Sequence, residues 1–233
     1  MKAFLLASTL GGVLLLAGCA STQQARTVQT DSFLAPYASL LQQDGNDNRA
    51  LLHYNKPGTD WAAYDKIQLL PVKLLSDEKG EKSAQQKQEL QQLVDGFSST
   101  LYQKLAKDYS MVQTPQADTL QMQVAISHGD PSEAGLAFVS RLPGPQRLLS
   151  TLYSKVSGTP AFSGGITLEL VIKDAQSGTL LAAAADRQVG GMHIAKPHAF
   201  DSWGDVENAL QFYADSIAAH LCKARGGDSC QEN

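Results

Sequence analysis

Two segments of the chain carry large apolar residues at helical spacing, one near the middle and one near the C-terminus. An apolar residue every three or four positions indicates a helix that turns one face to a core. We therefore expect long amphipathic helices from about Ser83 to Lys107 and from about Ser202 to Cys222. Their apolar faces are Leu90, Leu93, Val94, Phe97, Leu101 and Leu105 in the first helix, and Trp203, Val206, Leu210, Tyr213, Ile217 and Leu221 in the second.

Four other segments predict strands, namely 66–75, 119–127, 166–173 and 179–188. In the second and third of these, apolar residues alternate with others in steps of two, which is typical of a strand with one buried face. The first contains Pro71, which has no amide hydrogen for a ladder, so we expect a bulge or an edge position there. A turn from Asp174 to Gly178 joins the last two and predicts a hairpin.

These elements follow one another as strand, long helix, strand, crossover, strand, hairpin turn, strand and long helix. Two amphipathic helices need a sheet face to cover them, so the order predicts an α/β (α+β) two-layer sandwich. We expect a mixed, mostly antiparallel sheet of about four main strands, with both helices on one face. The opposite face, with Gln121, Gln123, Thr167 and Glu169, is then expected to meet water, the crossover or a partner. On this interpretation, Glu169→Arg leaves folding intact.

The chain before the first of these strands consists of three segments that differ in composition. From Ala20 to Ser32 it is rich in Ser, Thr and Gln, which predicts a flexible tether. The apolar cluster from Phe33 to Leu41 is spaced as one face of a short helix or turn that docks on the domain. The following stretch, Leu51 to Tyr64, contains a Pro-Gly turn and is expected to form an extended arm. The aromatic side chains and His53 of this arm either line a ligand groove or, as we favour, pack in the core.

Residues 1–18 have the pattern of a signal peptide. Lys2 supplies a positive charge, and the apolar stretch that follows is shorter than a membrane-spanning helix. The stretch ends in Leu16-Ala17-Gly18-Cys19, the lipobox pattern of bacterial lipoproteins, which are cleaved before a lipidated cysteine. The sequence therefore divides into a lipoprotein signal peptide at 1–18, the lipidated Cys19 with a flexible tether at 19–32, and a single α/β domain at 33–233.

Lipidation of Cys19 would hold the protein on a membrane, because more than one acyl chain is enough for stable anchoring. The next residue is Ala20 and not Asp. By resemblance to the sorting rule of enterobacterial lipoproteins, this favours the periplasmic face of the outer membrane over the inner membrane. The alternative is an ordinary secretory signal in which Cys19 has no role.

Two further cysteines, Cys222 and Cys230, lie near the C-terminus. The periplasm is oxidising, and Gly226 and Gly227 allow the chain to turn back, so we expect a disulfide between them. A metal site would need more ligands than two thiols and the nearby His220.

The formal net charge is −4, from 19 Lys and Arg against 23 Asp and Glu. Binding to nucleic acid is favoured by clustered Lys and Arg, which release counterions, so we expect no nucleic-acid partner. The same balance argues against electrostatic attachment to a membrane surface.

Short patterns scattered along the chain are Tyr37-x-x-Leu40, Tyr54-x-x-Pro57-Gly58-x-Asp60-x-x-x-Tyr64, Leu70-Pro71-Val72, Asp174-x-x-x-Gly178, Asp186-Arg187 and Trp203-x-x-Val206. Together with the order of elements, they resemble an uncharacterised bacterial lipoprotein family, the domain of unknown function thirty-three thirteen. The likeness spans roughly Phe33 to Leu221. A looser likeness joins the chain to periplasmic lipoproteins that assist transport, secretion or surface-fibre assembly. The family implies a location and a fold, and it supplies no catalytic residues.

Common catalytic motifs are missing from the sequence, including the Gly-x-Ser-x-Gly elbow, the phosphate-binding loop and His-Glu-x-x-His. We therefore predict no catalytic, cofactor-binding or metal-binding residue, and no cofactor. The nearest alternative is a loop with His193 and His198, surrounded by Asp186, Asp201 and Asp205, which could bind zinc or relay protons. The simpler interpretation is that Asp201 caps the last helix and that the two histidines are solvated.

Two classes of function remain. The first is a non-enzymatic binding or assembly module, held at the membrane by the lipid on Cys19, with an envelope protein complex as its candidate partner. The second is a metal-dependent hydrolase or ligand-binding protein that acts on envelope glycan or lipid through the loop of His193 and His198. The anchor and the missing motifs favour the first class, because function has to be argued from a site.

Overall fold

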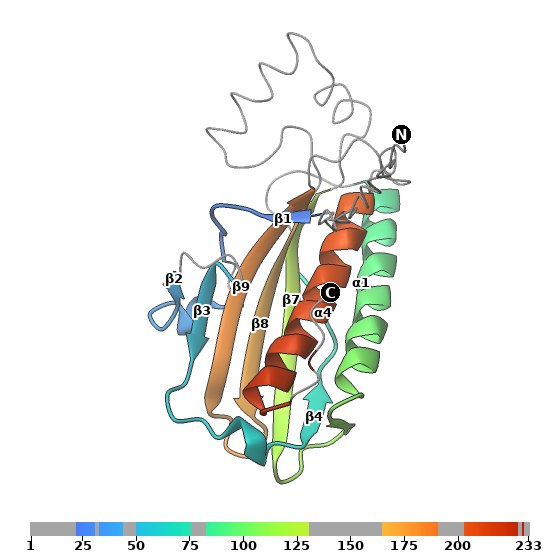
Figure 1. Cartoon of the computed structure of the whole chain (residues 1–233). Coiled ribbons are helices and arrows are strands. Elements are labelled where there is room, and N and C mark those ends of the chain that lie inside the picture. The colour runs from blue at the N-terminus through green and yellow to red at the C-terminus, as the bar shows by residue number, and fades with distance from the viewer. Residues whose placement is uncertain are drawn as a thin grey trace, which may run out of the picture.

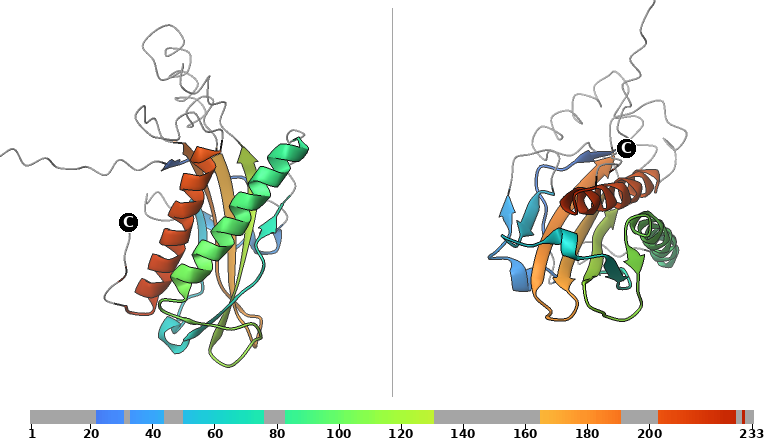
Figure 2. Two further views of the ribbon diagram at one scale, coloured as in Figure 1. Left: turned by 90° about the vertical axis from the view of Figure 1, so that its right-hand side faces the viewer. Right: turned by 60° about the horizontal axis from the view of Figure 1, so that its bottom comes forward.

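The computed structural model describes residues 22–30, 33–43, 50–75, 83–130, 165–190, 203–227 and 230. These residues form a sheet with two long helices over one of its faces (Figures 1 and 2). Most of the predicted crossover, between the second and third predicted strands, lies outside the described residues.

The predicted hairpin lies inside the sheet. Its strands β8 (Gly165–Asp174) and β9 (Leu180–Gly190) pair antiparallel. Between them, one carboxylate oxygen of Asp174 accepts hydrogen bonds from the backbone amides of Gln176 and Ser177, at 3.2 and 2.6 Å. Gly178 has a φ of 70°, a value that glycine adopts without a side-chain clash. The turn therefore forms where the pattern from Asp to Gly predicts it.

The sheet has more strands than we expected. Its order is β2-β3-β9-β8-β7-β4-β6, with β1 beside β9 and β5 beside β7, so the described residues contain nine strands. The expectation of about four main strands was too low, because strands of two to four residues are too short to show a period. The remaining strands are β1 (Thr22–Gln24), β2 (Gln42–Gln43), β3 (Leu52–Asn55), β4 (Lys66–Leu69), β5 (Lys73–Leu74), β6 (Ser110–Met111) and β7 (Thr119–Asp130).

The strand directions agree with a mixed, mostly antiparallel sheet. β1 and β3 both pair antiparallel with β9, β2 with β3, and β8 with both of its neighbours. Parallel pairs lie at one side of the sheet, where β4 pairs with β6 and β7, and β5 pairs with β7. The predicted bulge is present between β4 and β5. Leu69 pairs with Met122 and Lys73 with Ala125, so four steps along one strand match three along the other, with Pro71 in the interruption.

The two helices are α1 (Ala84–Leu105) and α4 (Gly204–Ala224), each within two residues of its predicted ends. α1 begins at a capping box, in which Ser83 and Gln86 each accept a hydrogen bond from the other's backbone amide. The helices contact each other along the sheet (Figure 1). Lys104 of α1 forms an ion pair with Asp215 of α4, and the indole N–H of Trp203 donates to Glu89 at 2.6 Å.

The face of the sheet under the helices, which we call the helix face, is largely apolar. Alternate residues of β7 and β8 point to it and are buried against the apolar stripes of α1 and α4. Burial of each large side chain stabilises the fold by about 1.5–3 kcal/mol. Its fully buried members include Ile67, Leu101, Leu105, Leu120, Met122, Val124, Ile126 and Ile166.

The opposite face, which we call the outer face, is covered by the N-terminal segment. Residues 25–30 and 33–41, named here the N-terminal strap, include the short 3-10 helix η1 (Ala35–Tyr37). Leu34 is fully buried in a second cluster with Val171 and Ala183, and Leu52 of β3 packs at its side. The predicted docking of the cluster from Phe33 to Leu41 is therefore confirmed.

We expected the outer face to meet water, the crossover or a partner, and part of it is covered by the strap instead. Thr167 is 1% exposed and Glu169 is fully buried, whereas Gln121 and Gln123 are half-buried. Small side chains on the paired strands, Ala183 and Ala185, allow the strap to lie close to the sheet. Glu169→Arg is therefore no longer expected to leave folding intact.

A second correction concerns the flexible tether predicted for 19–32. Its residues Thr22–Gln24 form β1 and pair antiparallel with β9, and Ala25 is 5% exposed. The backbone amide of Ala25 donates to the carbonyl of Arg187 at 2.8 Å. Pairing of this kind uses backbone groups, so a segment poor in apolar residues can still join a sheet. The ordered domain begins before Phe33.

Candidate functional site

The disulfide predicted from the sequence is present. Cys222, in the last turns of α4, is bonded to Cys230, and their Cα atoms are 5.6 Å apart. Gly226 supplies a φ of 84° at the point where the chain leaves the helix. At Gly227, a Cβ atom would lie 2.7 Å from the sulfur of Cys222, so the disulfide needs a glycine at this position.

Several other predicted residues lie outside the described part of the chain. These are Cys19, His193, His198 and Asp201. Asp205 is described and lies in the first turn of α4, where a negative charge favours the helix dipole. Within the described ranges, no group of three or more His, Cys, Asp or Glu side chains could hold a metal ion. No helix in those ranges is long and apolar enough to cross a membrane.

Asp186, which we considered as a neighbour of the histidine loop, lies instead in a buried polar network under α4. One of its carboxylate oxygens accepts hydrogen bonds from the side-chain amide of Gln24 at 2.6 Å and from the backbone amide of Leu51 at 3.2 Å. The other oxygen accepts from the side-chain amide of Gln188 at 2.8 Å. Asp186 is 6% exposed and Gln188 is 3% exposed. We call Asp186, Gln24, Gln188 and the Leu51 amide the Asp186 network.

Tyr213 of α4 closes this network from the helix side. It is 4% exposed, and its hydroxyl donates to the carbonyl of Ile166 at 3.4 Å. Burial, together with the negative charge of Asp186, raises the pKa of Tyr213 well above its usual value. The phenol therefore stays neutral and acts as a hydrogen-bond donor.

The Asp186 network connects separate parts of the chain. Its donors come from β1, from the residue before β3, and from β9 itself. Since both carboxylate oxygens already accept hydrogen bonds inside the protein, we assign the network a structural role. The sequence contained a signal for it. Asp186 and Gln188 continue the positions of Ala182 and Ala184, so they point to the helix face, where a charge needs buried partners.

The aromatic residues of the predicted arm do not gather into one groove. Tyr54 packs in the outer cluster, whereas Trp61 and Tyr64 pack against the core of the helix face. The hydroxyl of Tyr64 donates to Asp174 at 3.1 Å. Partial burial and this hydrogen bond raise the pKa of Tyr64. The favoured interpretation, core packing, is confirmed for these three aromatic side chains, and His53 is half-buried in β3.

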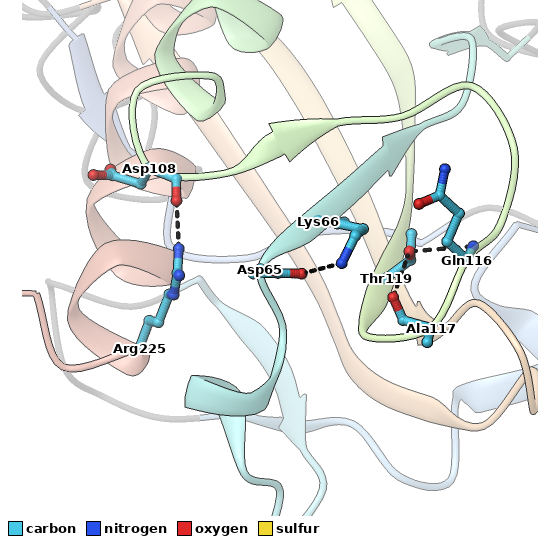
Figure 3. A network of polar contacts seen from close by, with 7 residues as sticks. All are labelled: Asp65, Lys66, Asp108, Gln116, Ala117, Thr119 and Arg225. Carbon is cyan, nitrogen blue, oxygen red and sulfur yellow. Dashed lines mark hydrogen bonds and ion pairs between the residues drawn. The ribbon is translucent and has the colours of Figure 1, made fainter.

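A further set of polar contacts lies where α1 and α4 end, away from β1 (Figure 3). The guanidinium of Arg225 donates to the backbone carbonyl of Asp108 and lies 5.0 Å from the ring of Tyr109. Lys66 bonds Asp65 at 2.6 Å, and this hydrogen bond lowers the pKa of the exposed Asp65 carboxyl. The contact of Arg225 joins the C-terminal ends of the two helices, and the contact between Lys66 and Asp65 is local to the start of β4. They are structural contacts.

The fold and these contacts define an α+β domain, a mostly antiparallel sheet under two helices, whose described polar interior serves to hold chain segments together. Residues 29–217 match the family described as "Protein of unknown function (DUF3313)". The chain belongs to this family.

Comparisons beyond the family give weak likenesses. The PelC dodecamer from Paraburkholderia phytofirmans is 10% identical and has a TM-score of 0.38, over 76% of this chain and 96% of that chain. A putative neuraminyllactose-binding hemagglutinin homolog from Helicobacter pylori is 13% identical, with a TM-score of 0.34, over 68% of this chain and 83% of that chain. At such scores these likenesses carry no argument about the present chain. No curated protein matches it.

Proposed function

We propose that the protein is a lipid-anchored lipoprotein of the bacterial envelope that works as a non-enzymatic binding or assembly module. The observation that carries this proposal is the use of its 3 cysteines. Cys19 ends a lipobox, and Cys222 and Cys230 form a disulfide. Disulfides persist in oxidising compartments such as the periplasm, so both features point to the same side of the membrane.

The choice between the outer and the inner membrane is proposed from one residue. Ala20 follows the lipidated cysteine, where the enterobacterial sorting rule that we applied retains proteins with Asp. We therefore place the protein on the periplasmic face of the outer membrane.

A binding role is supported by how the described polar interior is used. The buried carboxylate of Asp186 accepts hydrogen bonds at both oxygens, and its donors come from three segments of the chain. Such an arrangement stabilises a scaffold, since one buried group ties three segments of the chain together. In this proposal, the lipid on Cys19 holds the domain at the membrane, and the surface of the domain binds the partner.

The anchor is tested by metabolic labelling with a palmitate analogue in cells that produce a tagged protein. We expect label in the wild type and none in Cys19→Ser, which should also remain uncleaved by the lipoprotein signal peptidase. A variant with both Cys222→Ser and Cys230→Ser is the matched control, because it removes two cysteines and should still be labelled. Normal processing of Cys19→Ser would refute the anchor.

The binding role is tested by cross-linking in intact cells, with mass spectrometry of the proteins that co-purify with the tagged wild type. We expect a reproducible envelope protein that is captured with the anchored form and lost with Cys19→Ser. Capture of the same proteins by both forms would argue against a role that depends on location. Absence of any protein partner would count against the assembly role.

A further inference from the structure

The N-terminal strand fixes where the anchored chain enters the domain. Thr22 pairs with Gly190 and Gln24 with Gln188, so the chain enters β1 beside the C-terminal end of β9. The N-terminal ends of α1 and α4 lie at the same end of the molecule (Figure 1). We call this the β1 end. The hairpin turn at 174–178 and the C-terminal ends of both helices lie at the opposite end, which we call the hairpin end.

β1 is held to the sheet by more than its ladder. The amide of Gln24 donates to the buried carboxylate of Asp186 at 2.6 Å, and the Ala25 amide donates to the carbonyl of Arg187 at 2.8 Å. α4 covers this strand from the helix side. Release of β1 would leave a buried carboxylate with fewer donors, which is costly in a low-dielectric interior.

The distance from a lipidated Cys19 to this strand is short. Three residue steps separate Cys19 from Thr22, and a chain spans at most about 3.6 Å per residue, or about 11 Å in all. The strand β9 has 11 residues and is therefore about 36 Å long. A lipid on Cys19 thus keeps the β1 end close to the bilayer, and the domain is long enough for the hairpin end to stand well away from it.

The described side faces of the domain offer little attraction to a lipid surface. The exposed large apolar residues are scattered over the turn after η1, β5, α1 and α4, namely Leu40, Leu74, Tyr102 and Phe212. The net charge of −4 also disfavours close approach to anionic headgroups. Exposed apolar area, which holds peripheral proteins on a membrane, is therefore small and scattered on these faces, and the net charge of the chain adds no attraction to anionic lipid.

We propose that the β1 end is the membrane-facing surface of the anchored protein and that the hairpin end points away from the bilayer. This inference rests on the proposed anchor at Cys19. The partner of the β1 end is a lipid headgroup layer. Envelope proteins would then meet the side faces and the hairpin end, which carries the contacts of Arg225 and Asp65 (Figure 3).

The 2 tryptophans mark the two ends and allow a direct test. Trp203 lies at the start of α4, at the β1 end. Trp61 lies in η2 (Trp61–Ala63), directly before Tyr64, which binds Asp174 at the hairpin turn. α4 has 21 residues, so its two ends are about 32 Å apart. A separation of this size changes energy transfer from tryptophan to an acceptor at the membrane surface.

The experiment uses the full-length lipidated protein in vesicles of phosphatidylethanolamine and phosphatidylglycerol that contain a dansyl-labelled headgroup lipid. Trp61→Phe leaves Trp203 as the donor, and Trp203→Phe leaves Trp61. We expect a larger loss of donor fluorescence for Trp203 than for Trp61. A Gly/Ser insertion of about twelve residues before Thr22, which adds a span of about 20 Å, is the matched control and should reduce the difference.

The outcomes separate the orientation from the anchor. A protein that carries acyl chains and sediments with vesicles, yet transfers equally from both tryptophans or more from Trp61, overturns the orientation and leaves the anchor intact. A protein without acyl chains that does not sediment overturns both.

A second measurement needs no substitution. Neutron reflectometry of the wild type on a supported bilayer gives the thickness of the protein layer. We expect at least the length of β9, about 36 Å, and a clearly thinner layer would contradict the upright orientation.

Discussion

The two faces of the sheet are buried by different means. The helix face is covered by α1 and α4, two long helices whose apolar stripes are visible in the sequence. The outer face is covered by the N-terminal strap, which has one short 3-10 helix and only one fully buried large residue, Leu34. A helix that covers a sheet can be recognised in the sequence by the spacing of its apolar residues, whereas an irregular covering segment has no such spacing. A strand pattern with polar residues on one face therefore does not establish that this face is wet.

The largest expected effect comes from Glu169→Arg on the outer face. Glu169 is fully buried, opposite Ala125 on one neighbouring strand and Ala185 on the other. A longer side chain of opposite charge has no room and no water there, so we expect a loss of about 4 kcal/mol or more in the free energy of unfolding. Circular dichroism and denaturant titration of the purified variant measure it.

Gln123→Arg is the matched control for this substitution. Gln123 lies on the same face of the sheet, but it is half-buried and its amide donates to the carbonyl of Pro71 at 2.9 Å. We expect a loss of less than about 1 kcal/mol. Equal effects for the two variants would mean that the difference in burial between these positions has no energetic consequence, and the account of the outer face would fail.

The next effect compares one buried leucine from each face. Leu101 of α1 and Leu34 of the strap are both fully buried. We expect Leu101→Ala to lower the free energy of unfolding by about 3–4 kcal/mol, because packed helices collapse poorly around a cavity. For Leu34→Ala we expect about 2 kcal/mol, since an irregular segment can shift into the space. Denaturant unfolding gives both values, and a larger loss at Leu34 would reverse the ranking.

A smaller loss of stability is expected from a substitution in the polar part of the helix face. Gln24→Ala removes one donor of the Asp186 network, and we expect a loss of about 1–2 kcal/mol. Hydrogen exchange should rise first at the amides of β1, which this donor helps to hold. Gln43→Ala, at an exposed position of β2, is the control and should leave both measurements unchanged. Unaltered exchange in β1 for Gln24→Ala would show that the network does not hold this strand.

The smallest effect concerns the turn that sets the register of β8 and β9, and with it the identity of each face. Hydrogen bonds from Ser177 lower the pKa of the Asp174 carboxyl below 3.8. A carboxyl with a lowered folded-state pKa stabilises the fold above its unfolded pKa, and this contribution disappears as the pH falls through the folded value. We expect Asp174→Asn to cost about 1 kcal/mol near neutral pH and almost nothing near pH 2. Unfolding curves at several pH values test this, and a constant difference would contradict it.

Much of the helix face could be predicted from the sequence because its signals are local. The stripe from Leu90 to Leu105 and the alternation in β7 each span one continuous segment. The bulge at Pro71 and the turn at Gly178 follow from the backbone chemistry of single residues. The disulfide follows from the pairing of two nearby cysteines.

The sequence indicates that Asp186 points to the helix face, but the docking of the strap and the donors to Asp186 could not be predicted, because these contacts join distant segments. Gln24 meets Asp186 across 162 positions, and the Leu51 amide meets it across 135. β1 pairs through backbone groups, which every residue except proline carries, so its sequence gives no sign of a partner strand. The polar composition of residues 20–32 predicts a solvated segment, although one of its polar side chains, Gln24, donates to the buried carboxylate of Asp186.

The N-terminal strap also implies an order of events during synthesis. A ribosome makes the strap before residues 165–190, which form β8 and β9 and supply Val171, Ala183 and Ala185 to the cluster around Leu34. Leu34 therefore has no docking surface until β9 has been made, and its contacts are among the longest-range in the chain. The strap is therefore synthesised early and docks only after β8 and β9 have been made.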